Sequence, residues 1–132
     1  MSDLDAVGPA VLVVDDEAGM RDTLTDIFID AGYRVSSAGD GFEALDRLRE
    51  GHFDVVIMDM RMPGKDGVST LEEMGPPPPP VIMITAYAVD EQLRRAAASH
   101  AYAVLHKPFG VPHLLRLVET ALNATPEDGT RQ

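Results

Sequence analysis

The 132-residue sequence contains no cysteine and no tryptophan, and aromatic residues make up only 5% of it. Without cysteine there is no disulfide framework and no thiolate chemistry. No apolar run approaches the roughly 20 residues that a membrane-spanning helix needs. The first eight residues carry acidic rather than basic side chains, which is not typical of a signal peptide. Together these absences predict a soluble cytoplasmic domain without a membrane partner.

Positive charge is also scarce, because 11 Lys and Arg stand against 22 Asp and Glu and give a formal charge of −11. Proteins that bind nucleic acids usually present a basic surface to the phosphates. We therefore expect no direct nucleic-acid binding. Hydrophobic residues make up 45% of the chain, which is ordinary for a globular protein. The length fits one domain with a full core.

Short apolar runs alternate with segments of helical periodicity along most of the chain. Unbroken apolar runs are typical of strands that are buried on both faces of a parallel sheet. The pattern predicts an α/β, doubly wound five-stranded parallel sheet in the order 2-1-3-4-5, a flavodoxin-like arrangement. Its ligand crevice is expected between the first and third strands. The expected strands are residues 10–14, 34–37, 55–58, 81–84 and 102–105.

The segments between the expected strands carry helix signals. In the second expected helix, Asp40 is the predicted N-cap and Glu43 completes a capping box. Phe42, Leu45 and Leu48 are predicted to form its buried stripe. A fourth helix is expected after the fourth strand, and the last helix is expected to end near residue 124.

Five consecutive prolines, at positions 76–80, end the short third helix expected at 68–74, because proline lacks the amide donor. We interpret the tract as a stiff connector into the fourth strand. A polyproline ligand for a partner domain is the alternative. Residues 1–9 and 125–132 are expected to be flexible ends around a single domain at 10–124.

Acidic side chains follow two strands that are expected to be neighbours. Asp15 and Asp16 come directly after the first strand, and Asp59 comes after the third. Carboxylates at such close range raise one another's proton affinity unless a cation joins them. Oxygen ligands favour a hard divalent ion, and Mg²⁺ is the one we expect. The structural alternatives are helix capping by Asp15 and Asp16 and a turn at Asp59.

The fourth and fifth strands are expected to bring a hydroxyl, Thr85, and an ammonium, Lys107, to the same rim. Taken singly, each residue also fits an ordinary strand end or surface. Together with carboxylates and Mg²⁺, they are suited to handling a phosphoryl group that a carboxylate accepts as an aspartyl-phosphate. No Gly-rich Walker loop is present, so a nucleotide is not the expected donor.

Four motifs in order carry a resemblance to a known family: VVDDE at 13–17, DMRMPGKDG at 59–67, TA at 85–86 and KPF at 107–109. The chain closely resembles the response-regulator receiver domain of two-component signal transduction, in the CheY-like superfamily, from about Ala10 to Ala124. The resemblance implies a phosphorylation-activated signalling switch in a phosphorelay. The donor would be a histidine kinase or a histidine phosphotransfer protein. The output would be a changed surface of the fourth helix, fifth strand and fifth helix.

The resemblance also implies roles for individual residues. Asp59 would be the phosphoacceptor. Asp16, Asp59 and the backbone carbonyl of Arg61 would bind Mg²⁺ directly, and Asp15 would act through a metal-bound water.

The remaining roles concern the phosphoryl group and its lifetime. Lys107 would pair with the phosphoryl oxygens, Thr85 would bond to one of them, and the peptide bond from Lys107 to Pro108 would be cis. Arg61, Ala86 and Tyr87 occupy positions that modulate the lifetime of the phosphoryl group.

One position departs from the family pattern. The switch aromatic normally lies three residues before the lysine, where this chain has Val104. Tyr102 points to the same face but lies about 7 Å further from the active edge, at roughly 3.3 Å per residue. We therefore expect the output to rest on Thr85 and loop movement, or on Tyr87, rather than on the usual coupling to an aromatic.

Other functions remain in competition at this stage. A Mg²⁺-dependent phosphohydrolase that works through an aspartyl-phosphate is the main alternative, and a flavin carrier is a third. The receiver interpretation predicts no turnover enzyme, only self-catalysed phosphoryl transfer and dephosphorylation. The protein is either a stand-alone receiver that acts on a downstream target or a receiver without its output domain. A phosphorylation-dependent homodimer is a further expectation.

Overall fold

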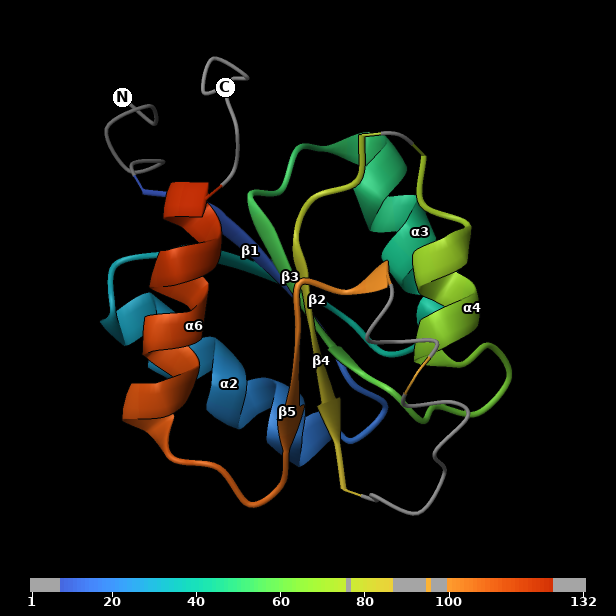
Figure 1. Cartoon of the computed structure of the whole chain (residues 1–132). Coiled ribbons are helices and arrows are strands. Elements are labelled where there is room, and N and C mark those ends of the chain that lie inside the picture. The colour runs from blue at the N-terminus through green and yellow to red at the C-terminus, as the bar shows by residue number, and fades with distance from the viewer. Residues whose placement is uncertain (1–7, 76, 87–94, 96–99, 125–132) are drawn as a thin grey trace.

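The computed structural model describes residues 8–75, 77–86, 95 and 100–124. Its five strands form one sheet in the order β2-β1-β3-β4-β5, and each neighbouring pair is parallel. Figure 1 shows the strands crossing the centre of the molecule with helices on either side. The predicted fold class and strand order are confirmed. The strands are β1 (Ala10–Val14), β2 (Arg34–Ala38), β3 (Val55–Asp59), β4 (Val81–Thr85) and β5 (Ala103–His106).

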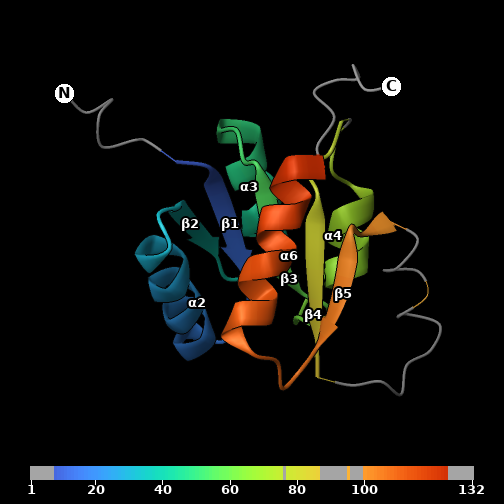
Figure 2. The same cartoon turned by 60° about the vertical axis from the view of Figure 1, so that its left-hand side comes forward.

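Helices cover both faces of the sheet, as the two views show (Figures 1 and 2). On one face lie α2 (Ala18–Asp30) and α6 (Val111–Ala124), and on the other lie α3 (Gly41–Glu50) and α4 (Gly67–Glu72). The expected fourth helix lies outside the described residues. Within the described part of the chain, no helix has both the length and the hydropathy to cross a membrane.

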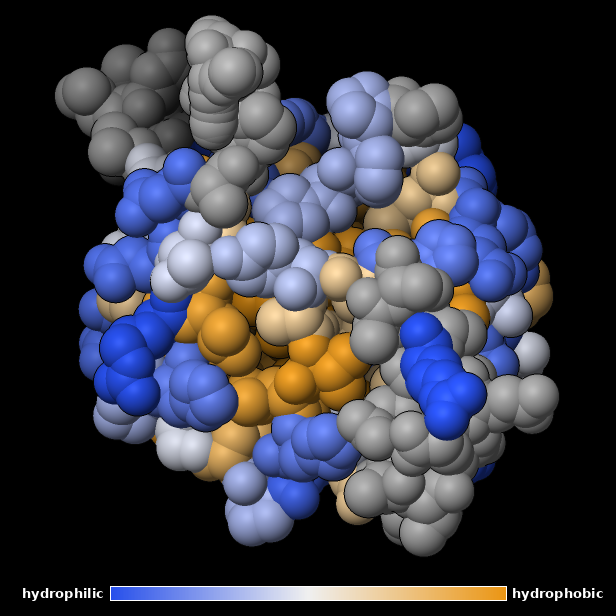
Figure 3. Space-filling model, in the orientation of Figure 1, coloured by the Kyte–Doolittle hydropathy of each residue, from blue (hydrophilic) through white to orange (hydrophobic). Residues whose placement is uncertain are grey.

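Two apolar layers result from the alternation of side chains along the central strands. Leu12, Val56 and Met83 point toward α3 and α4, whereas Val13 and Ile57 point toward α2 and α6. Every residue of β1 and β4 is buried, which is why their sequences show no polar alternation. In Figure 3 hydrophobic residues gather at the centre of the face between α6 and β5, with hydrophilic residues around them.

The second expected helix forms, but its buried face differs from the prediction. Asp40 caps α3 by accepting a hydrogen bond from the Glu43 amide at 2.8 Å. The Glu43 side chain accepts from the amide of Gly39 at 2.7 Å, one residue before the expected partner. Phe42 is 59% exposed, so its assignment to the core was wrong. The buried side of α3 is formed by Gly41, Ala44 and Leu45. Phe42 projects to one side of it, because successive residues of a helix point in different directions.

Tyr102 lies just before β5 rather than in it, although its amide still donates to the Val81 carbonyl at 2.8 Å. Its side chain is exposed, whereas Val104 is half-buried against the layer under α3 and α4. Residues 77–80 lead directly into β4, as the connector interpretation expects, and Pro76 lies outside the described residues.

Candidate functional site

The carboxyl ends of β1 and β3 bring three acidic side chains together. Val14 pairs with Met58 in the register of these strands, so the following residues, Asp15 and Asp59, emerge side by side. Ligand oxygens of Asp15, Asp16 and Asp59 all lie within 4.8 Å of one another. Asp15 is buried, Asp59 is partly buried and Asp16 is exposed, so the cluster opens to solvent on one side. The convergence that the strand pattern predicted is therefore present.

Backbone amides orient two of these carboxylates. The Glu17 amide donates to Oδ1 of Asp15 at 2.9 Å, and the Arg61 amide donates to Oδ1 of Asp59 at 3.2 Å. Each bond uses one oxygen, and a carboxylate has a second oxygen with which to bind a cation. The loop after Asp59 comes back close to the strand, because the Gly67 amide donates to the Met60 carbonyl at 2.9 Å. A Cβ atom at Gly67 would lie 2.6 Å from the Asp59 carbonyl oxygen, so glycine is required there.

The site lowers the acidity of two carboxyl groups, those of Asp59 and Asp15. Burial, followed by repulsion from Asp15, raises the pKa of Asp59 to about 6, although Lys107 and the Arg61 amide act in the opposite direction. Burial also raises the pKa of Asp15. A cation bound between these groups would remove the repulsion, and oxygen donors suit a hard divalent ion. The residues present therefore fit a metal ion.

The strands β4 and β5 supply the other two predicted groups. Thr85 is the last residue of β4 and is 1% exposed, and its carbonyl accepts from the Lys107 amide at 2.8 Å. The positive charge of Lys107 lowers the pKa of both Asp15 and Asp59, so its ammonium lies close enough to act electrostatically on the acidic cluster. The peptide bond from Lys107 to Pro108 is cis, as the resemblance implied. Four strands thus contribute to one rim.

Two of the three residues expected to modulate the site are among the described residues. Arg61 and Ala86 are exposed next to Asp59 and Thr85, whereas Tyr87 lies outside the described residues. The sequence did not point to Arg21, whose Nη1 atom donates to the backbone carbonyl of Asp15 at 2.7 Å. The sequence does contain a signal for this contact, because Arg21 is a long basic side chain in the first turn of the helix that follows Asp15 and Asp16.

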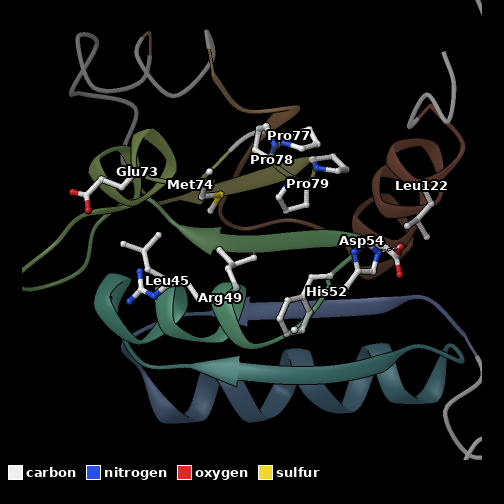
Figure 4. A pocket seen from close by; sticks show the side chains of 15 residues that line it. Leu45, Arg49, His52, Asp54, Glu73, Met74, Pro77, Pro78, Pro79 and Leu122 are labelled. Atoms are coloured by element: carbon white, nitrogen blue, oxygen red, sulfur yellow. Dashed lines mark hydrogen bonds and ion pairs between the residues drawn. The ribbon is translucent and has the colours of Figure 1, made fainter.

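A pocket of about 910 Å³ lies at the other edge of the sheet, where β3 and β4 begin (Figure 4). It is bounded by the ends of α3 and α4 and by the prolines that lead into β4, and its polar side chains include both acids and bases. The acidic cluster is not part of it. The lining includes Leu45, Leu48, Arg49, His52, Phe53, Asp54, Met74, Pro77, Pro78, Pro79, Pro80 and Leu122.

Comparison with known proteins identifies the family. The model of the response regulator receiver domain matches residues 11–119. The transcriptional regulatory protein PdtaR of Mycobacterium tuberculosis is 35% identical over 125 residues, which are 92% of this chain and 61% of PdtaR. Sporulation initiation phosphotransferase F of Bacillus subtilis is 32% identical over 114 residues, 85% of this chain and 92% of that protein. This chain therefore spans less than two thirds of PdtaR but most of phosphotransferase F.

A solved structure agrees with the sequence relatives. The receiver domain of the sensor histidine kinase PA1611 from Pseudomonas aeruginosa has a TM-score of 0.80 and 26% identity. The match covers 89% of this chain and 100% of that domain, which was solved with a magnesium ion coordinated in its active-site cleft. The chain belongs to the response regulator receiver domain family, whose members are phosphorylation-activated signalling switches.

Proposed function

We propose that this receiver domain accepts a phosphoryl group on Asp59 from a histidine kinase or a histidine phosphotransfer protein. The observation that carries the proposal is the approach of the Asp15, Asp16 and Asp59 oxygens within 4.8 Å, where the positive charge of Lys107 also acts on Asp59. Of the three carboxylates, Asp59 ends the central strand β3 and belongs to the DMRMPG motif. The comparisons do not favour the alternative, a phosphohydrolase.

We assign Mg²⁺ to the acidic cluster. Asp16, Asp59 and the backbone carbonyl of Arg61 would hold it, with Asp15 acting through water. When bound, the ion supplies positive charge that offsets the negative charge of the phosphoryl oxygens. The magnesium ion in the PA1611 receiver domain supports this choice.

In the proposed transfer, a carboxylate oxygen of Asp59 attacks the phosphorus of a phosphohistidine. The oxygen–phosphorus bond forms as the phosphorus–nitrogen bond breaks, and the electron pair returns to the imidazole nitrogen, which takes up a proton. The attacking carboxyl group must be ionised. Since its pKa is about 6, most of it is ionised at neutral pH.

Lys107 and Thr85 stabilise the transferred group in this proposal. The Lys107 ammonium pairs with phosphoryl oxygens, and the Thr85 hydroxyl donates a hydrogen bond to one of them. Arg61, Ala86 and Tyr87 set how readily water reaches the phosphoryl group. The domain catalyses only its own phosphorylation and dephosphorylation.

The output we propose is a change of the surface of β5, α6 and the fourth helix expected from the sequence, which lies outside the described residues. Thr85 leads directly into this region, and its carbonyl is bonded to the Lys107 amide, so phosphorylation acts on both neighbouring loops. With Val104 at the switch position, this change rests on Thr85 and the loops. The recipient is a downstream target, an output domain or a second copy of the phosphorylated chain.

Acetyl phosphate tests the proposal because it donates a phosphoryl group without a kinase. We expect the wild type to gain one phosphoryl group by intact-mass analysis when Mg²⁺ is present, and Asp59→Asn to gain none. Asp54→Asn, at the opposite end of β3, is the matched control and should label normally. Equal labelling of Asp59→Asn would refute the assignment. Rapid multiple turnover of p-nitrophenyl phosphate by the wild type would instead indicate a phosphohydrolase.

A further inference from the structure

Two of the proposed metal ligands stand on a link of only three residues, 15–17, between β1 and α2. Asp15 is held from two sides: its amide donates to the Ala38 carbonyl at 3.1 Å, and its side chain accepts from the Glu17 amide. Asp16 is exposed, so its direction depends on the backbone that carries it. Glu17, the N-cap of α2, makes no side-chain capping bond that would fix this backbone.

The side chain of Arg21 makes a third hydrogen bond to the segment 15–17. It lies in the first turn of α2, where its amide donates to the Glu17 carbonyl at 3.0 Å, and its side chain turns back toward the helix start. Nη1 reaches the carbonyl oxygen of Asp15 at 2.7 Å. That carbonyl belongs to the peptide group joining Asp15 to Asp16, so the bond fixes the rotation of the unit that sets one ligand relative to the other.

The guanidinium itself is confined by the turn between β2 and α3. A Cβ atom on Gly39 would lie 3.3 Å from Nη1 of Arg21 and 3.4 Å from Oε1 of Glu43, so Arg21 lies directly against this turn. The turn is itself fixed, because the Gly39 amide donates to Glu43 at 2.7 Å. Arg21 therefore connects the link that carries the acids to a rigid neighbouring turn.

We infer that Arg21 is a positioning residue for the metal ion: it orients Asp15 and Asp16 through their shared peptide group without touching the ion or the phosphoryl group. The inference rests on the proposed function. The cation that lowers the pKa of both Asp15 and Asp59 is Lys107, whereas the contact of Arg21 is with a backbone oxygen. Arg21 thus acts by geometry, like the outer-shell partners that orient ligands at other metal sites.

The test is the affinity for Mg²⁺ alone, measured by isothermal titration calorimetry on the whole chain. Loss of an outer-shell partner typically weakens metal binding by 10–100-fold. We expect Arg21→Gln to raise the dissociation constant by about tenfold or more. Arg21→Lys keeps a donor on a shorter side chain and should lie between Arg21→Gln and the wild type.

Arg34→Gln is the matched control. Arg34 also donates from its side chain to a backbone carbonyl, that of Gly8 at 2.9 Å, but it lies at the start of β2, away from residues 15–17 and from the Gly39 turn. We expect this variant to bind Mg²⁺ as the wild type does. At saturating Mg²⁺, acetyl phosphate should label Arg21→Gln at a rate within about threefold of the wild type, because the chemical groups are intact.

Two results would overturn the inference: an Arg21→Gln dissociation constant within about twofold of the wild type, or equal weakening by Arg34→Gln, which would indicate general loosening. In both cases the wild type still binds Mg²⁺ and the proposed function stands. If the wild type binds no Mg²⁺, the metal assignment in the proposed function fails and the role of Arg21 fails with it. Thermal unfolding midpoints of both variants, measured without metal, separate loss of affinity from loss of folding.

Discussion

Oxygens of Asp15 and Asp59 lie within 4.8 Å of each other, because the two residues follow the paired positions Val14 and Met58 on neighbouring strands. Burial, followed by this approach of a second carboxylate without a cation, raises the pKa of Asp59 to about 6. Carboxyl groups with pKa values perturbed in this way are often found at functional sites.

In the absence of metal, Asp59→Asn should stabilise the folded protein near pH 8. The native carboxyl group has a pKa of about 6, raised above the ordinary aspartate value of 3.8. The native state therefore holds this proton more tightly than the unfolded state. The contribution of Asp59 to stability is present at low pH and is lost as the pH rises through about 6.

The neutral amide avoids this loss, by up to roughly 3 kcal/mol for a shift of this size. The gain from Asp59→Asn should shrink toward zero below about pH 4. Urea unfolding with a chelator present, at several pH values, measures it. Asp26→Asn, on the exposed side of α2, is the control. A gain that is independent of pH would show that ionisation of the Asp59 carboxyl group is not its source.

Mg²⁺ should stabilise the wild type against thermal unfolding, because a ligand that binds only the native state adds RT ln(1 + [L]/Kd). At about one hundred times the dissociation constant this amounts to roughly 2.7 kcal/mol. Asp16→Asn should lose most of the shift at little structural cost, since Asp16 is exposed. An equal shift in Asp16→Asn would remove this residue from the proposed ligand set.

Lys107→Met should raise the pKa of Asp59 above about 6, because the ammonium now lowers it. The carboxyl carbon of Asp59 in ¹³C NMR reports this titration, and Asp54 at the other end of β3 provides an internal reference. Labelling by acetyl phosphate should slow by about 100-fold, as expected for removal of one group that stabilises developing charge. If the pKa of Asp59 is the same in Lys107→Met and the wild type, the Lys107 ammonium does not act on Asp59 in solution.

Two glycines, Gly41 in α3 and Gly19 in α2, differ in the space around their missing side chains. A Cβ atom at Gly41 would lie 2.1 Å from Oγ1 of the buried Thr70, so Gly41→Ala should destabilise the domain by about 1–3 kcal/mol. Gly19 is the second residue of α2 and has nothing within 4 Å of its missing Cβ, so Gly19→Ala should stabilise by up to about 1 kcal/mol. Chemical denaturation of the two variants measures both signs. Similar effects at both positions would contradict this account of the packing.

Much of the fold was predictable because the strands are buried on both faces and their apolar runs are unbroken. Periodicity was less informative where a helix is short. Phe42 fits a helical stripe by spacing, yet its ring lies over the Gly64–Lys65 loop, with Nζ of Lys65 5.2 Å from the ring centroid. Such a contact depends on how α3 and α4 meet, which local pattern does not specify.

The acidic cluster was predictable for a different reason. In a parallel sheet every strand ends at the same edge, so chain position alone brings Asp15, Asp59, Thr85 and Lys107 together. Arg21 was missed because its partner is a backbone oxygen. Side-chain motifs reveal which groups do chemistry, but they say little about the bonds that hold a peptide group in place.

The most direct test of the central claim is to locate the phosphoryl group itself. The wild type is treated with acetyl phosphate and Mg²⁺, the acyl phosphate is reduced with borohydride, and the chain is sequenced by tandem mass spectrometry. The account predicts homoserine at position 59 and aspartate at positions 15 and 16. Reduction at 15, 16 or any other carboxyl group, with position 59 unchanged, would contradict it.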